Sequence, residues 1–234
     1  MMLGARTAAW SGKALPYDAE VEWIKGDGNA YVKTGVIPSI TTSAKIGIVD
    51  FIYSSIEFIF GVCDVDFKTQ SFTLSANRED ISIFRIFFSG SSLRYDQGNF
   101  KSAIYSHNNF NGEILITPNY TKVNEEVFTY YQSPVPPMSL TNDIWLFDRN
   151  TLGVGTSLKS KAKVSKFEIY DGDNLVLGFK PVKVRRGDSF VGYFYDYARP
   201  SSGPFGNGLY GNSAAGNEGF PMSLVGPDKM MNEL

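Results

Sequence analysis

Cysteine and histidine are almost absent from this chain of 234 residues, since each occurs once, as Cys63 and His107. A single cysteine excludes a disulfide within the chain, and one residue of each type is too few for a zinc site of cysteines and histidines. We interpret Cys63 as a small buried thiol, because it follows an apolar run at residues 58–62. His107 lies in a polar stretch, and the chain has no Gly-x-Ser-x-Gly motif that would supply a serine nucleophile.

A strong charge of one sign is also lacking, because 22 lysines and arginines face 24 acidic residues and leave a net charge of −2. Without a basic patch, nucleic acid and anionic membranes are not expected as partners. No stretch approaches the ~20 apolar residues that cross a bilayer, and the N-terminus has neither the charged start nor the apolar core of a secretory signal. We therefore expect no membrane insertion. We also expect a protein that stays in a cytoplasm or leaves it by lysis or by packing into a particle.

Paired carboxylates, which glycosidases require, are missing from the strand candidates. Such enzymes place an acid and a second carboxylate across the sugar bond, and residues two apart on a strand share one face. The long candidate at residues 45–53 carries only Asp50. Asp64 and Asp66 are two apart, but they follow Cys63 in a predicted loop. The sequence therefore predicts no catalytic residue and no enzyme.

Motifs that bind nucleotides or metals are absent as well. The glycine-rich segment 203–219 is followed neither by a helix pattern nor by the Lys-Thr pair of a phosphate loop. Asp171, Asp173 and Asn174 have oxygen ligands suited to Ca²⁺, yet a plain hairpin turn favours the same residue types. We interpret them as a turn and expect no cofactor and no metal.

Aromatic residues are abundant, with 18 phenylalanines and 13 tyrosines, and they favour strands over helices. Alternating or apolar runs separated by turn formers predict strands at residues 19–24, 31–36, 43–53, 58–62, 71–76, 81–88, 114–117, 127–131, 144–147, 163–170, 175–184 and 190–195. The runs at 114–117 and 127–131 are expected to pair with each other, and 108–112 is expected to be a polar loop. Strands at this spacing indicate one all-β sandwich domain over residues 19–234.

The first 18 residues differ from the rest, because they are small, flexible and rich in turn formers. Two interpretations remain open: a disordered tail, as termini often are, or an arm that docks on another protein. Leu3 and Trp10 favour docking, since a free tail gains nothing by exposing them and Trp is enriched in interface cores. We assign Leu3, Arg6 and Trp10 as the docking residues.

Tyrosines near the end of the chain suggest a surface for sugars. Tyr193, Tyr195 and Tyr197 alternate along one strand and so share a face. The next segment adds Asn207, Tyr210 and Asn212. Aromatic faces beside amide groups suit glycan binding, and Tyr210 is expected at an exposed loop tip. The alternative is that these rings pack the core and rim of the last strand.

Several segments carry a family resemblance. They read VEWI at residues 21–24, GNAYVKTGV at 28–36, YDG at 170–172, FKPV at 179–182, GYFYD at 192–196 and GP at 226–227. In these segments the chain resembles the laminin-G-like, concanavalin A-type jelly rolls of gut Bacteroidales and their phages, with one residue inserted after Gly192. The resemblance implies a jelly-roll β-sandwich of ten or more strands, a fold that usually serves in ligand binding or surface display.

The N-terminal residues 2–10, MLGARTAAW, resemble the start of virion proteins of Bacteroides phages. Arm and jelly roll together imply a structural protein of the virion surface, such as a head or tail fibre or a decoration protein. Its partners would be other virion proteins through the arm, host-surface or mucin glycans, and further copies of the chain in a homo-oligomer. One alternative is a bacterial carbohydrate-binding module of a polysaccharide-utilisation system. Another is a glycoside hydrolase or lyase, although the absence of paired carboxylates argues against an enzyme.

Overall fold

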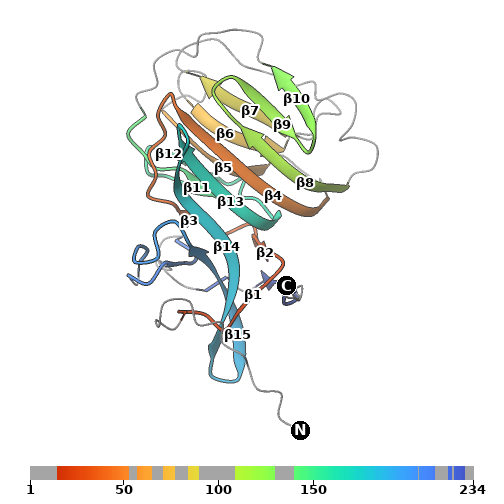
Figure 1. The fold of residues 1–234 in the computed structure, drawn as a ribbon, viewed down its shortest axis with the longest axis vertical. Coiled ribbons are helices and arrows are strands. Elements are labelled where there is room, and N and C mark those ends of the chain that lie inside the picture. Colours follow the sequence, from red (N-terminus) through yellow and green to blue (C-terminus); the bar gives the residue numbers. More distant parts are fainter. Residues whose placement is uncertain are drawn as a thin grey trace.

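The structure is a computed structural model in which two β-sheets lie face to face (Figure 1). It describes residues 15–52, 57–64, 71–76, 84–89, 109–129, 140–204, 206–213, 221–222 and 224–229. These residues form strands and connecting loops without a helix. The expected all-β class is confirmed, and two facing sheets are the arrangement of a β-sandwich. In the described part of the chain, no helix is long and apolar enough to cross a membrane.

The larger sheet has 11 strands within the described residues. Its main path runs in the order β10 (Glu126–Thr129), β9 (Tyr120–Val123), β8 (Asn109–Ile116), β4 (Thr42–Ile52), β13 (Lys163–Asp171), β14 (Asn174–Arg186), β15 (Ser189–Asp196) and β16 (Leu209–Tyr210). Three short strands lie off this path: β1 (Ala19–Glu20) pairs with β14, and β2 (Ile24–Lys25) pairs with β13 and with β17 (Leu224–Val225). The β14–β15 hairpin extends beyond the two layers, with β1 beside it (Figure 1).

The smaller sheet has six strands within the same residues, and it lies behind β4, β8 and β13 in Figure 1. Its order is β3 (Val32–Lys33), β11 (Trp145–Leu146), β5 (Glu57–Cys63), β6 (Ser71–Ala76) and β7 (Phe84–Ser89), while β12 (Arg149–Thr151) pairs with β5 in parallel. All seven residues of β5 and all six of β6 are buried, so both faces of these strands are covered.

The main core fills the space between the sheets. Along β4, Ala44, Ile46 and Ile48 are buried while Lys45 points the other way, as strand alternation requires. Phe60 of the smaller sheet meets Phe167 of the larger one, with ring centroids 5.0 Å apart. Each such fully buried ring stabilises the fold by about 1.5–3 kcal/mol relative to an exposed one.

The three strands near the C-terminus form where the sequence predicts them. β13, β14 and β15 match the expected runs at 163–170, 175–184 and 190–195, with one or two further residues at most of their ends. The two hairpin turns contain Gly172 and Gly187, whose φ angles of 57° and 61° lie in the left-handed region that glycine adopts without strain. The turn interpretation of Asp171, Asp173 and Asn174 is therefore confirmed.

The expected polar loop at 108–112 is wrong for residues 109–112, which belong to β8. Phe110 supplies the reason, because it is 3% exposed and pairs with Phe51 across a register shift in β4. The expected pairing of 114–117 with 127–131 is also wrong, since β9 lies between β8 and β10 and pairs with both. Both errors arise because polar residues on one face hid the strand pattern.

The N-terminal strand also differs from the expectation. Residues 19–24 form two strands with different partners, because the chain passes from β14 to β13 at Val21, which makes a separate bridge to Asp228. Tyr17 already packs on Tyr195, and Asp18 accepts a hydrogen bond from the Arg185 amide at 2.7 Å. The last residues assigned to the arm thus contact the sheet.

Gly26 tests the packing between β2 and the chain leading into β13. A Cβ atom at this position would lie 2.1 Å from the carbonyl oxygen of Ser160 and 2.9 Å from the Phe147 ring. Because the Ser160 carbonyl cannot move aside without distorting the backbone, we expect Gly26→Ala to lower the free energy of unfolding by about 2–4 kcal/mol in urea titrations. Gly187→Asn is the control, since that site is open and asparagine tolerates its φ. Equal effects of both substitutions would contradict the tight contact.

Candidate functional site

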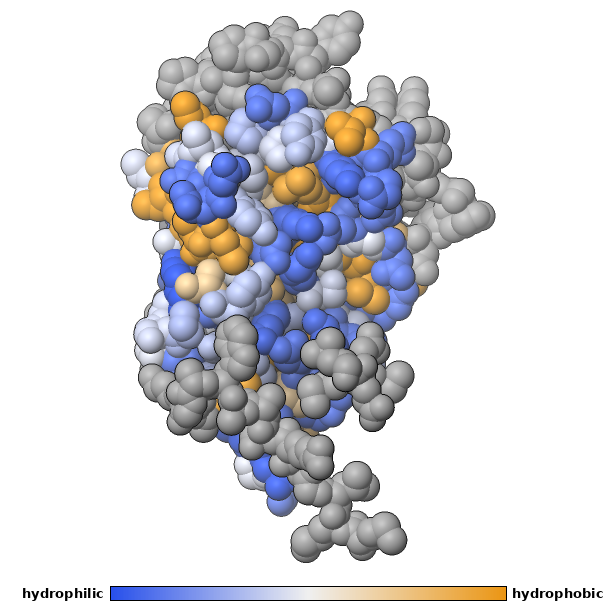
Figure 2. Space-filling model, in the orientation of Figure 1, coloured by the Kyte–Doolittle hydropathy of each residue, from blue (hydrophilic) through white to orange (hydrophobic). Residues whose placement is uncertain are grey.

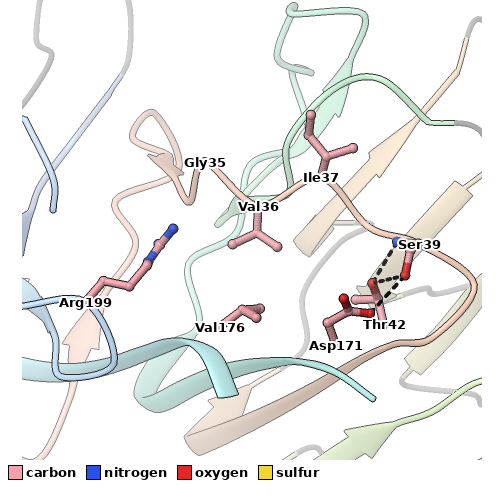
Figure 3. Close-up of a pocket in the computed structure, with 8 residues that line it drawn as sticks. All are labelled: Gly35, Val36, Ile37, Ser39, Thr42, Asp171, Val176 and Arg199. Carbon is pink, nitrogen blue, oxygen red and sulfur yellow. Dashed lines mark hydrogen bonds between the residues drawn. The ribbon is translucent and has the colours of Figure 1, made fainter. Parts of the chain in front are cut away.

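A pocket of about 480 Å³ opens at one end of the strands (Figure 3). This rim pocket is lined by Gly35, Val36, Ile37, Ser39, Thr42, Asp171, Val176 and Arg199. Four parts of the chain meet there: the β3–β4 connection with the first residue of β4, the end of β13, the start of β14 and the loop after β15. Its volume falls within the ~300–1,000 Å³ typical of small-molecule sites.

The walls of the rim pocket are apolar in the middle. Val36 and Val176 are half-buried and pack against the main core, while Ile37 is 54% exposed at the mouth. Val176 reaches the pocket through a β-bulge, because Ile169 pairs with Leu177 and Tyr170 with Leu175, which leaves Val176 as the extra residue. A bulge redirects a side chain in this way.

One side of the pocket holds a carboxylate among hydroxyl groups. The Oδ1 atom of Asp171 accepts hydrogen bonds from the Ser39 hydroxyl at 3.2 Å and from the Thr41 hydroxyl. The Ser39 amide donates to Thr42 Oγ1 at 2.7 Å, which fixes the turn that carries these groups. No described residue donates to Asp171 Oδ2, so this oxygen is free to accept a hydrogen bond from a ligand.

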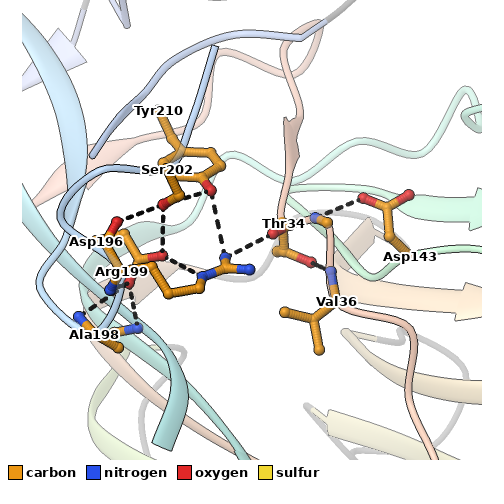
Figure 4. A network of polar contacts seen from close by, with 10 residues as sticks. Thr34, Val36, Asp143, Asp196, Ala198, Arg199, Ser202 and Tyr210 are labelled. Carbon is orange, nitrogen blue, oxygen red and sulfur yellow. Dashed lines mark hydrogen bonds and ion pairs between the residues drawn. The ribbon is translucent and has the colours of Figure 1, made fainter. Parts of the chain in front are cut away.

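The opposite side of the pocket holds the guanidinium group of Arg199, with Val36 and Val176 between it and Asp171 (Figure 3). Its Nε donates to Asp196 Oδ2 at 2.7 Å, and its Nη2 donates to the Thr34 carbonyl at 2.9 Å and to the Tyr210 hydroxyl at 3.4 Å (Figure 4). Nη1 donates to none of the described residues, and the side chain is 34% exposed. Arg199 therefore presents fixed, unused donors to the pocket.

Asp196 holds Arg199 in this position. Its side chain is fully buried, and its Oδ1 accepts from the amides of Gly178, Ala198 and Arg199 at 3.0, 3.1 and 3.2 Å. Its Oδ2 accepts from Arg199 Nε and from the Ser202 hydroxyl at 3.3 Å. A buried charge is tolerated when its lone pairs are satisfied in this manner.

The wall formed by the β3–β4 connection is also fixed by hydrogen bonds. Thr34 donates its hydroxyl to the Ile144 carbonyl at 2.7 Å. The same hydroxyl accepts from the Val36 amide at 3.1 Å (Figure 4). The Gly35 amide donates to Asp143 Oδ2 at 3.0 Å, and the φ angle of Gly35 is 69°. Both walls of the pocket are thus held by hydrogen bonds to other parts of the fold.

The tyrosines predicted to bind glycans do not form an exposed platform. Tyr193 and Tyr195 share the outer face of β15, as expected, but they are 1% and 8% exposed. They form a second small cluster with Val182 and Leu209, which Tyr17 covers. The alternative, that these rings pack, is correct for Tyr193 and Tyr195, because the N-terminal segment lies over a face that the sequence alone left open.

Tyr197 is 39% exposed, yet its ring lies against Gly178 and its hydroxyl donates to Glu168 Oε1 at 2.5 Å. Burial and this bond to Glu168 raise the pKa of the Tyr197 phenol far above its usual range. Tyr170 donates to the other oxygen of Glu168 at 2.9 Å. Tyr197 therefore belongs to a polar network on the outer face of the larger sheet and does not line the rim pocket.

Tyr210 is a core residue, so its expected place at an exposed loop tip is wrong. It is 8% exposed, and its ring packs on Phe179 with centroids 4.8 Å apart. Its hydroxyl donates to Ser202 Oγ at 3.1 Å and accepts from Arg199. It thus supports the rim pocket from behind.

The remaining predicted site residues contribute less or lie elsewhere. Asn207 Oδ1 accepts from the Leu209 amide at 3.2 Å and so shapes a turn, while Asn212 is half-buried. Neither lines the pocket. The docking residues Leu3, Arg6 and Trp10 lie outside the described residues, as does His107.

The acidic residues considered for catalysis are not brought together. Asp50, at the outer end of β4, forms an ion pair with Lys163 at 3.3 Å. Asp64 directly follows β5 in the smaller sheet, and Asp66 lies outside the described residues. Where the structure describes the chain, no three His, Cys, Asp or Glu side chains are grouped as metal ligands would be.

The outer face of the larger sheet is the second polar region. Glu113 of β8 pairs with Lys45 at 2.8 Å and with Lys166 at 2.5 Å. Burial alone would raise the pKa of the Glu113 carboxyl, but the hydrogen bonds from Lys166 and Lys45 together lower it. Hydrophilic residues fill much of this view in Figure 2, with apolar groups scattered among them. Glu113, Lys45 and Lys166 thus satisfy one another on this face.

Sequence reasoning missed Arg199, Val176 and the β3–β4 wall as site residues. Arg199 follows Asp196 by three positions, a spacing that allows the ion pair between them. That spacing was the one local signal. Val176 owes its place to a bulge, and no residue pattern in the sequence marks it.

Comparison with known proteins does not identify a family. No family model, no curated protein and no solved structure matches the chain. Any function must therefore be argued from the geometry of the rim pocket and from the resemblance of short segments.

The different roles of Tyr210 and Tyr197 can be measured as stability. We expect Tyr210→Ala to lower the free energy of unfolding by about 3–5 kcal/mol, because it leaves a cavity beside Phe179 and removes two hydrogen bonds. Tyr197→Ala, at a half-exposed position, should cost about 1 kcal/mol. Urea unfolding of both variants is the measurement. A Tyr210→Ala cost no larger than that of Tyr197→Ala would place Tyr210 outside the core.

Proposed function

We propose that this chain is a non-catalytic β-sandwich module that binds a carbohydrate in the rim pocket. The observation that carries the proposal is the lining, with unused donors on Arg199, a free acceptor on Asp171 and the apolar side chains of Val36 and Val176 between them. A sugar ring has a matching surface, because its hydroxyls both donate and accept while its C–H groups are apolar. Pockets with few polar groups in an apolar lining are typical ligand sites.

The finer fold in this proposal is a laminin-G-like, concanavalin A-type jelly roll. Two facing sheets of mostly antiparallel strands support it. So do the positions of the resembling segments. Residues 170–172 form the β13–β14 turn, 179–182 lie in β14, and 192–196 end β15 at the buried Asp196. The similarity thus falls on residues that hold the rim pocket together.

The biological setting in this proposal is the surface of a phage virion. The resemblance of residues 2–10 to virion proteins supports it, with head fibre, tail fibre and decoration protein as the candidate locations. A pocket of this size binds one or two sugar units, so a single copy would bind weakly. Display of many copies on a particle raises the overall affinity by about 10²–10⁴ without new contacts.

Binding can be tested with a pair of matched exposed positions. Ile37 is 54% exposed at the pocket mouth, and Val127 is 55% exposed on β10, at the edge of the larger sheet. We expect a multivalent form of the protein to bind a subset of a glycan array, and Ile37→Ser to weaken that binding several-fold. Val127→Ser should leave it unchanged. Array binding unaffected by Ile37→Ser and by Asp171→Ala would place the glycan site elsewhere, and no binding to any glycan would refute the proposal.

The docking arm can be tested by two truncations. Removing residues 1–14 should leave the melting temperature unchanged but prevent incorporation into particles, measured by virion proteomics. Removing residues 1–18 should also lower the melting temperature, because Tyr17 covers Tyr195 and Asp18 bonds to Arg185. Normal incorporation of the protein that lacks residues 1–14 would show that the arm does not dock.

A further inference from the structure

The chemistry of the rim pocket narrows the class of sugar that it fits, and this inference rests on the proposed function. We propose that the pocket recognises an N-acetylated amino sugar. In this arrangement the acetamido carbonyl accepts a hydrogen bond from Arg199, the acetyl methyl packs on Val36 and Val176, and a ring hydroxyl donates to Asp171. Three features support this proposal: the charges of the pocket, its apolar surface, and the order of donor, apolar wall and acceptor across it.

Charge argues against an acidic sugar. The guanidinium of Arg199 is neutralised by Asp196, whose carboxylate lies 2.7 Å from its Nε. The other charged group of the pocket lining is the carboxylate of Asp171. A ligand carboxylate would therefore gain little net attraction and would be repelled by Asp171. A neutral carbonyl oxygen uses the same Nη1 donors without that repulsion.

The unused donors of Arg199 are also held in place before any ligand arrives. Three hydrogen bonds, to Asp196, Thr34 and Tyr210, fix the plane of the guanidinium (Figure 4). A fixed planar donor loses little conformational freedom when it binds an acceptor. Arg199 is thus suited to select a carbonyl in one orientation.

The apolar part of the pocket lies next to these donors. Figure 3 shows the side chains of Val36 and Val176 between Arg199 and Asp171. Both valines are half-buried on the core, so their exposed methyl groups form a firm apolar surface. An acetamido group joins a carbonyl acceptor to a methyl group within a few atoms, which matches this order of a donor beside an apolar wall. A plain hexose has a hydroxyl at that position, so only its ring C–H groups can pack on the wall and less of the wall is covered.

Asp171 completes the order of groups. Its Oδ2 accepts no hydrogen bond from described residues, whereas its Oδ1 is held by Ser39 and Thr41. A carboxylate can only accept, so it selects a donor, and sugar hydroxyls are donors. The ligand class is therefore one with a neutral acceptor and a methyl at one end and hydroxyls at the other.

The test is a series of small ligands that differ at one group, titrated into the full-length protein and followed by protein-observed NMR. The methyl glycosides of N-acetylglucosamine and N-acetylgalactosamine should include one that binds about tenfold more tightly than its parent hexoside, a difference typical of one apolar group in a pocket. The matching uronic acid glycoside should bind no more tightly than the parent hexoside.

Two variants locate the preference in the pocket. Val176→Thr keeps the shape of the side chain but replaces a methyl with a hydroxyl, so it should reduce the preference for the N-acetyl sugar to about threefold or less. It should leave the affinity for the plain hexoside unchanged. The control is Val127→Thr, the same exchange on β10, which should change neither affinity. Melting temperatures of both variants show whether the fold is retained.

The outcomes separate this inference from the proposed function. Equal binding of the N-acetyl sugars and the hexosides, or tighter binding of the uronic acid glycoside, would overturn the inference while carbohydrate binding stands. An N-acetyl preference that Val176→Thr leaves intact would also overturn it, because the acetyl group would then bind elsewhere. Binding of none of these sugars by a protein that still binds the glycan array would refute the inference alone, whereas absence of binding in both experiments would refute both.

Discussion

The buried carboxylate of Asp196 is the constraint on which the rim of this protein depends. It lies at the end of β15, and its five hydrogen bonds tie together β14, the loop that follows β15, and the guanidinium of Arg199. A fully buried charge without partners would destabilise the fold strongly, so the surrounding chain is held in the one conformation that satisfies it. The position of Arg199 follows from that conformation.

The core and the pocket are linked through the same residues. Tyr210 packs its ring on Phe179 in the core and turns its hydroxyl toward Arg199 and Ser202. Thr34 accepts from Arg199 through its carbonyl, and its hydroxyl joins the β3–β4 connection to Ile144, which directly precedes β11 in the same smaller sheet. Binding groups at the pocket are therefore supported by packed, rigid elements, which is what allows a small pocket to select among similar ligands. The outer face of the larger sheet differs, because its lysines and glutamates satisfy one another.

Sequence reasoning was most successful where structure is local. The β13–β14 and β14–β15 hairpins were predicted, because strand alternation and the turns at Gly172 and Gly187 are properties of adjacent residues. It failed at β8 and β9, where Phe110 is buried by a partner strand distant in sequence. For the site, it placed Tyr193, Tyr195 and Tyr197 on one side of the last strand but could not tell that the first two are covered. Tyr17, far away in the sequence, supplies that cover.

The sequence by itself determined the all-β class, the principal hairpins and the absence of paired carboxylates from the long strand at 45–53, since each depends on residue types at short spacing. Only the tertiary structure decided which tyrosines are buried and where a pocket lies. The pocket joins residues 35–42, 171–176 and 199, and their proximity depends on sheet pairing, a β-bulge and the hydrogen bond from Arg199 to the Thr34 carbonyl. Such long-range contacts leave no period or motif in the sequence, because the energy that stabilises them comes from burial and from hydrogen bonds between distant segments.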